Sequence, residues 1–161
     1  MTRSGWIKSG LGLCVLAGVG AAVYFAVWAE DPAGRGLAMD PGDRAQVALG
    51  RKLYAAQCAS CHGKNLEGEA DWRKPKPDGS LRAPPHDRTG HTWHHPDQLL
   101  FAYTKFGGAK VTRGAVKSNM PGFEGTLSDS EIAAILAFIK SRWPADVRQR
   151  QQTMTEAYRN R

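Results

Sequence analysis

The sequence is poor in cysteine and in acidic residues, and it lacks the patterns of several other protein classes. Its 161 residues include three cysteines, and 22 Lys and Arg outnumber 15 Asp and Glu, which gives a formal net charge of +7. It has no alternating strand pattern of any length, no internal repeat and no nucleic-acid-binding motif, and its basic residues are scattered among Pro and Gly. These absences argue against a β fold, a repeat protein and a nucleic-acid-binding protein.

Glycine and proline, by contrast, are abundant for a helical chain. The sequence contains 18 Gly and 9 Pro, and 42% of it is apolar. This composition predicts one small domain with an ordinary core and long ordered loops.

The motif with the most chemical content is Cys58-Ala59-Ser60-Cys61-His62, a C-x-x-C-H pattern. It is typical of c-type haem attachment, because each thiol can bond one vinyl group of a porphyrin and the adjacent imidazole can ligate the iron. A redox-active thiol pair and half of a zinc site are the alternatives. The first would need a βαβ context and the second another ligand pair, whereas the third cysteine, Cys14, lies in an apolar run.

The N-terminal region is basic and then apolar. Two basic residues precede residues 9–29, which carry no charge and are about as long as the roughly twenty residues that cross a hydrocarbon core. Two acidic residues follow. We therefore expect residues 1–29 to form a membrane anchor that leaves the rest of the chain on the outer, periplasmic side. A signal peptide cleaved after Ala29 is the alternative, and in either case the chain beyond it is exported.

Three helical patterns follow a Gly- and Pro-rich linker over residues 30–42. We expect helices at about 43–57, 96–106 and 128–142. The last has a capping box of Ser128 and Glu131. In the first, one apolar face is expected from Val47, Leu49, Leu53 and Tyr54. We expect loops over 63–90 and 109–127, and a polar tail over 144–161, for which a frayed helix is the alternative.

The order of these parts resembles class I cytochrome c. A helix ending in C-x-x-C-H, a Pro-bearing loop, a middle helix, a Met-Pro loop and a C-terminal helix succeed one another over residues 43–143. The apolar segment before them resembles the membrane-anchored bacterial members. The resemblance implies an all-α cytochrome c fold of three main helices and long loops around one covalent haem c, preceded by a transmembrane helix in the bacterial inner membrane, with the haem domain in the periplasm.

The resemblance also implies roles for individual residues. It assigns thioether attachment to Cys58 and Cys61, proximal ligation of the haem iron to His62 and distal ligation to Met120. The alternative methionines are Met39 and Met154, but Met120 alone stands in a loop between two domain helices and is followed by Pro. A second axial histidine, from positions 86, 91, 94 or 95, is a further alternative.

Other residues match parts of the family's haem pocket. Pro84 or Pro85 matches the loop proline whose carbonyl receives the proximal imidazole N–H, although the family usually has an apolar residue next and here His86 follows. Gly50 and Tyr54 match the glycine and the aromatic residue of the first helix.

Two further expectations concern packing and the histidine-rich segment. Gly50 should permit a close helix crossing, and Tyr54 should pack near Phe138 of the last helix. Residues 91–95 are either a polar surface turn or a contact to a haem propionate through Trp93 or one of the histidines. A metal site from His91 and His95 is another alternative.

A haem iron whose two axial positions are filled by protein has no open site, so the resemblance implies an electron carrier rather than an enzyme. We expect it to move single electrons between redox proteins, such as a quinol–cytochrome c oxidoreductase and a terminal oxidase, in a respiratory or photosynthetic chain, with no small-molecule substrate.

Candidates for a basic docking surface are Lys52, Lys64, Lys105, Lys110, Arg113 and Lys117. The alternatives are a fixed haem subunit of a dehydrogenase or oxidase complex, a small haem peroxidase and a redox sensor. The loop over 66–88 is longer than a minimal carrier needs and is either a subunit contact or an extended haem cover.

Overall fold

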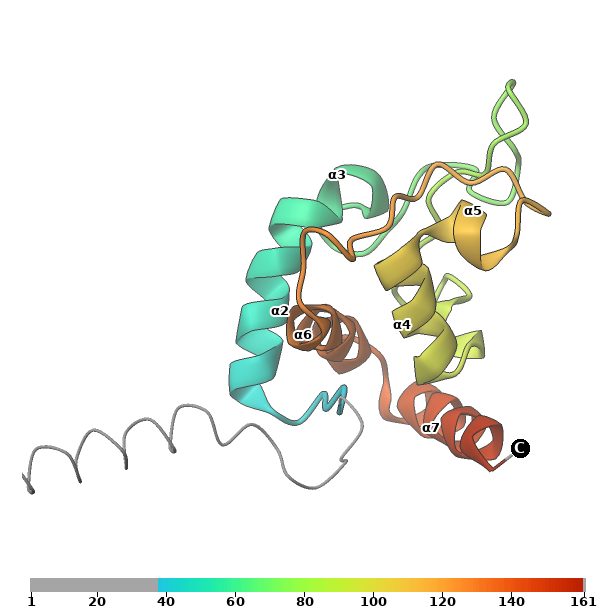
Figure 1. Cartoon of the computed structure of the whole chain (residues 1–161). Helices are drawn as coiled ribbons and strands as arrows, with labels where there is room; N and C mark the ends of the chain where they lie inside the picture. Colours follow the sequence, from blue (N-terminus) through green and yellow to red (C-terminus); the bar gives the residue numbers. More distant parts are fainter. Residues whose placement is uncertain (1–37, 161) are drawn as a thin grey trace, which may run out of the picture. The chain divides into compact units, whose positions relative to one another are not determined.

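The computed structural model describes residues 38–160. The predicted anchor over 1–29, Cys14 and the first part of the predicted linker lie outside these residues. Within them the chain forms helices and no strands, as predicted, joined by long loops (Figure 1). The elements are α2 Arg44–Gln57, α3 Ala59–His62, the 3-10 helix η1 Thr92–His94, α4 Asp97–Phe106, α5 Gly108–Val111, α6 Asp129–Ser141 and α7 Ala145–Arg159. Among these helices, none combines the length and the apolar composition that crossing a bilayer requires.

Helices α2 and α6 cross at close range in the centre of the domain. Helix α2 begins after Asp43, whose carboxylate accepts hydrogen bonds from the N–H groups of Ala45 and Gln46. At the crossing Gly50 is buried, and a Cβ on it would lie 1.9 Å from Ala134 O. The close approach that we predicted at this glycine is therefore confirmed.

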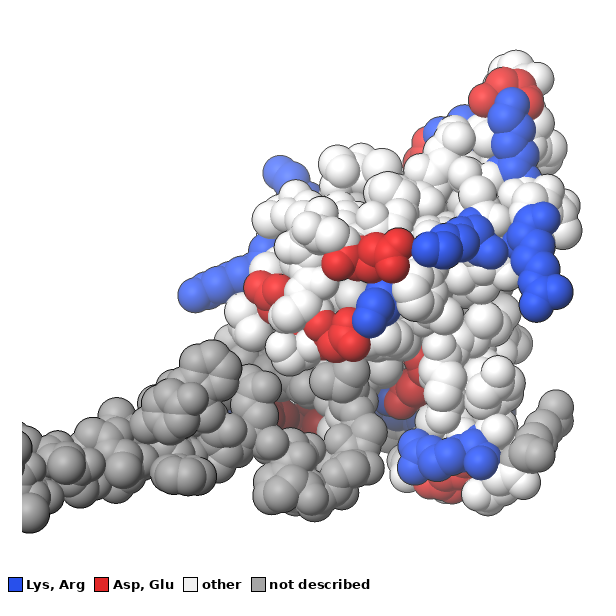
Figure 2. Space-filling model, in the orientation of Figure 1, with Lys and Arg blue, Asp and Glu red and all other residues white. Residues whose placement is uncertain are grey.

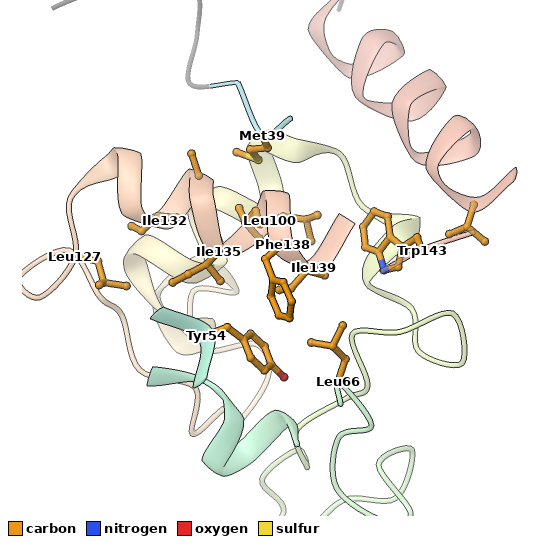
Figure 3. Packing of buried hydrophobic residues seen from close by; sticks show 13 residues of the cluster. Met39, Tyr54, Leu66, Leu100, Leu127, Ile132, Ile135, Phe138, Ile139 and Trp143 are labelled. Carbon is orange, nitrogen blue, oxygen red and sulfur yellow. The ribbon is translucent and has the colours of Figure 1, made fainter. Parts of the chain in front are cut away.

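The side chains around this crossing form one hydrophobic cluster (Figure 3). The ring centroids of Tyr54 and Phe138 are 5.4 Å apart, as predicted, and Leu66 from the following loop is 1% exposed in the same cluster. The prediction that Leu49 shares the buried face of α2 is wrong, because its side chain is 44% exposed. Gly50 faces α6. Successive residues of a helix are rotated by about 100°, so the side chain of Leu49 points away from α6.

Helix α6 is the central helix of the domain. Ser128 and Glu131 form the predicted capping box, in which each side chain accepts a hydrogen bond from the backbone N–H of the other residue. Every residue from Ile132 to Lys140 is buried. Other elements therefore surround this helix instead of covering a single apolar stripe of it.

Helix α4 begins one residue later than predicted, because Pro96 is its N-cap rather than its first residue. It ends at Gly107, whose φ of 83° lies in the left-handed region that favours glycine. The loop predicted over 109–127 is wrong at its start, where α5 adds a short helix. Thr112 closes this helix, since its N–H and its hydroxyl both donate to Gly108 O.

The segment predicted as a polar tail is a packed helix. Helix α7 buries Val147, Gln151 and Thr155 on one face. Gln151 Nε2 donates to Asp97 Oδ1 at 2.7 Å and to His95 O at 3.1 Å. The helix therefore joins the domain chiefly through polar contacts, which a search for an apolar stripe does not find.

The chain before α2 also packs on the domain. Met39 is 8% exposed and belongs to the hydrophobic cluster. Gln46 donates from Nε2 to Ala38 O at 2.7 Å and accepts at Oε1 from Asp40 N–H at 2.9 Å. The packed domain thus includes residues 38–40, which the sequence predicts to be part of the linker.

The ion pair between Lys140 and Asp97 joins α6 to the start of α4. The Nζ lies 2.8 Å from Oδ2, and the two side chains are 11% and 19% exposed. Lys140→Met leaves the largely buried Asp97 carboxylate without its cation, so we expect the free energy of unfolding to fall by about 3 kcal/mol in chemical denaturation. Lys74→Met removes an exposed pair with Asp71 and should cost less than about 0.5 kcal/mol. Equal losses in the two variants would contradict this prediction.

Candidate cofactor site

The two cysteines of the motif lie where α2 passes into α3. Cys58 caps both helices and is partly buried, whereas Cys61 is exposed, and both are free thiols. Burial, with a smaller effect of Cys61, raises the pKa of the Cys58 thiol to about 11. A redox-active C-x-x-C pair needs a lowered thiol pKa. Among residues 38–160 there is also no group of three metal-ligating His, Cys, Asp or Glu side chains, so both alternatives to haem attachment lose support.

His62 is the last residue of α3 and is 7% exposed. Its Nδ1 lies 2.9 Å from Pro84 O, so Nδ1–H donates there and Nε2 keeps its electron pair. Of the two candidate prolines, Pro84 is thus the partner of the ring, while Pro85 O accepts from Thr92 Oγ1 at 3.3 Å. Burial lowers the pKa of His62, although the hydrogen bond to Pro84 opposes this. A neutral imidazole with a free Nε2 is suited to metal ligation.

His86 makes a contact with His62 that the sequence did not predict. The two rings are stacked, with centroids 4.0 Å apart and planes 22° from parallel. His86 Nδ1 lies 2.8 Å from Thr92 Oγ1, and because that hydroxyl donates to Pro85 O, His86 Nδ1–H is the donor to it. Burial lowers the pKa of His86 well below its usual value, so the stacked ring is neutral. The signal available in the sequence was a histidine where the family usually has an apolar residue.

Two buried aromatic residues hold the loop near His62. Tyr54 donates from its hydroxyl to Gly63 O at 2.8 Å, and Trp143 Nε1 donates to His86 O at 2.7 Å. Burial raises the pKa of Tyr54 well above its usual value, so the hydroxyl remains a donor. These bonds connect α2 and the end of α6 to the two sides of the loop that carries Pro84.

Met120 lies in a segment that is held against α4 and α5. Its N–H donates to Ser118 Oγ at 3.2 Å, and its carbonyl accepts from Gly108 N–H at 3.2 Å. A Cβ on Gly107 would lie 2.7 Å from Gly122 N, so glycine permits the two segments to approach. The Met120 side chain itself is partly buried.

The two alternative methionines have other surroundings. Met39 packs within the hydrophobic cluster, and Met154 is partly buried on α7. The segment before Met120, by contrast, is hydrogen-bonded to residues 78–81 of the loop that also carries Pro84. These hydrogen bonds thus connect the segment before Met120 to the loop that contacts His62, whereas Met39 and Met154 have the other surroundings described above.

A comparison with models of protein families found a match: a model described as Cytochrome c covers residues 47–143. The chain belongs to the cytochrome c family. Comparisons with curated proteins and with solved structures found no match. Members of the family bind haem c covalently and transfer electrons through it, and one haem is typical of a single-domain member.

The donor set of this cytochrome fits a covalent haem. It offers two free thiols three positions apart, an imidazole whose Nδ1–H is already bonded to Pro84 O, and a thioether on a segment fixed by main-chain contacts. The electron pair of His62 Nε2 has no competing proton on that nitrogen. These are the groups that haem c uses for attachment and axial ligation.

The histidine-rich segment of the cytochrome is an aromatic cluster. Trp93 Nε1 donates to Arg88 O at 3.3 Å, so this N–H has an acceptor within its own loop. Trp72 stacks on His91 with ring centroids 5.3 Å apart, and His91 meets His95 edge-on at 5.2 Å. A contact between Trp93 and a haem propionate stays a prediction.

The lysines predicted to form one docking surface fall into two groups. Three of them have acidic partners: Lys105 pairs with Asp129, Lys110 with Glu124 and Lys117 with Asp78. On the face drawn in Figure 2, some basic side chains likewise lie next to acidic ones, and others stand apart from them. Lys52 and Lys64 instead line a cleft that also has Arg44, Arg51 and Arg142 on its walls. The docking prediction therefore applies best to Lys52 and Lys64.

Proposed function

We propose that this cytochrome is a one-electron carrier in which Cys58 and Cys61 attach the haem and His62 and Met120 are its axial ligands. The observation that carries the proposal is the hydrogen bond from His62 Nδ1–H to Pro84 O at 2.9 Å, which leaves Nε2 as an electron-pair donor. When bound, the haem supplies an iron that alternates between Fe(II) and Fe(III).

The residues around the two ligands have separate tasks. The Pro84 carbonyl fixes the tautomer and the orientation of the His62 ring and strengthens it as a donor. The Met120 thioether favours the ferrous state and raises the potential relative to a second imidazole. With His62 and Met120 as its two ligands, the haem iron would have no site left for a substrate, which is why we propose a carrier rather than a peroxidase.

The apolar segment over 9–29 would tether the carrier to the bacterial inner membrane, with the haem domain in the periplasm. A tether raises the effective concentration of the domain near membrane-bound partners. By family resemblance, a quinol–cytochrome c oxidoreductase would be the donor and a terminal oxidase the acceptor. The cleft with Lys52 and Lys64 would then meet an acidic surface of such a partner.

Spectroscopy of the protein purified from membranes tests this function. The holoprotein should titrate as a single one-electron couple, and the oxidised form should show the far-red absorption band of a methionine-ligated haem. The reduced form should not bind CO, because Met120 occupies the position that CO would need. Rapid CO binding or a missing far-red band would contradict the ligation. Haem absorbance in the soluble extract instead of the membrane fraction would contradict the tether.

A further inference from the structure

The long loop after His62 connects the surroundings of both proposed ligands. We call residues 69–83 the strap. At its base Glu69 and Ala83 pair with each other: Glu69 N–H donates to Ala83 O at 2.9 Å, and Ala83 N–H donates to the Glu69 carboxylate. Pro84, the acceptor for His62, follows directly. The base of the strap is thus fixed beside the proximal ligand.

The returning side of the strap, residues 78–81, lies beside the segment that precedes Met120, whereas the tip of the strap projects away from it (Figure 1). Three hydrogen bonds join them: Leu81 N–H to Lys117 O at 2.9 Å, Lys117 Nζ to Asp78 O at 2.7 Å, and Asn119 Nδ2 to Ser80 Oγ at 3.1 Å. Ser80 is completely buried, and its hydroxyl donates to Asp78 Oδ1 at 2.7 Å. Residues 78–81 of the strap therefore form an ordered contact with this segment.

The segment before Met120 has few other attachments. In the part of the chain that the structure describes, these three are the hydrogen bonds that connect residues 116–119 to other segments. On its other side Met120 is followed by Phe123, whose N–H donates to carbonyls of α4, and Met120 O accepts from Gly108 N–H. Contacts with α4 and α5 hold Met120 and the chain after it, whereas hydrogen bonds to the strap and the packing of Ser118 against Gly108 hold the chain before it.

We propose that the strap is a positioning element for Met120, in which Ser80, Lys117 and Asn119 keep the thioether at the iron by holding the segment that precedes it. The inference rests on the ligation by Met120 proposed above. A departure of the thioether that moves its segment away from the strap breaks the hydrogen bonds between them. Those bonds therefore favour the ligated conformation over the open one by their net free energy.

Imidazole added to the oxidised holoprotein measures this equilibrium, since it ligates the iron only when Met120 has left. In Lys117→Met/Asn119→Ala we expect the apparent affinity for imidazole to rise about tenfold, because two side-chain hydrogen bonds are lost. Covalent haem content should be unchanged. Lys74→Met is the matched control, because it removes the same charge from an exposed strap residue that pairs with Asp71. Its imidazole affinity should equal that of the wild type.

Three outcomes separate positioning from other effects. Lys117→Arg keeps a donor and should bind imidazole as the wild type does. A double variant that melts at a lower temperature but binds imidazole like the wild type would overturn the strap proposal alone. A wild-type protein without the far-red band would refute ligation by Met120, and the strap proposal with it.

Discussion

Replacing Gly50 with alanine should lower the free energy of unfolding by about 3 kcal/mol, although alanine is the better helix former. The added Cβ would lie 1.9 Å from Ala134 O and 2.4 Å from Ala134 C, which are main-chain atoms of α6 that cannot rotate away. On an open helix the same substitution would stabilise the protein by about 0.5–1 kcal/mol. The sign of the effect therefore tests the close crossing. Chemical denaturation of the holoprotein, followed by far-UV circular dichroism, measures it.

A matched control lies on the exposed side of the same helix. Ala56 is exposed, so Ala56→Gly changes helix propensity without changing a packed contact. It should cost about 1 kcal/mol. A Gly50→Ala protein stabilised by about the amount that Ala56→Gly loses would contradict the close crossing and assign the effect to helix propensity.

Local signals in the sequence predicted the parts of the fold that depend on neighbouring residues. The capping box of Ser128 and Glu131 starts α6 where expected, since both partners lie within one turn. The close crossing at Gly50 was predictable because a glycine inside a helix lowers helix stability and commonly marks a site of close packing. The C-x-x-C-H pattern placed two thiols and an imidazole together for the same reason of short spacing.

Contacts between polar groups far apart in the sequence were not predictable in this way. Gln151 meets Asp97, 54 residues earlier, and Asn119 meets Ser80, 39 residues earlier. Such pairs leave no period in the sequence, because each depends on where two loops or helix ends meet in space. The packing of α7, the stacking of His86 on His62 and the strap all belong to this class.

Met120→Ala should change the proposed electron-transfer site more than any substitution of a neighbouring residue, because it removes the proposed axial ligand and leaves the thiols for covalent attachment in place. We expect the far-red band of the oxidised protein to disappear and the ferrous protein to bind CO at the vacated position. The midpoint potential should fall by on the order of 100 mV, since axial ligands set haem potentials over a range of about 0.8 V and the thioether favours the ferrous state. Potentiometric titration and CO difference spectra measure these changes.

The alternative methionines provide the controls for this prediction. Met154→Ala removes a thioether from α7 and should leave both the band and the potential unchanged. Met39→Leu keeps an apolar side chain in the hydrophobic cluster and should also leave the spectrum unchanged, with a loss of stability below about 1.5 kcal/mol. If either control abolishes the band while Met120→Ala retains it, the distal ligand is not Met120. If the wild-type protein itself lacks the band, the distal ligand is none of these methionines, and the histidines of the 86–95 loop become the candidates.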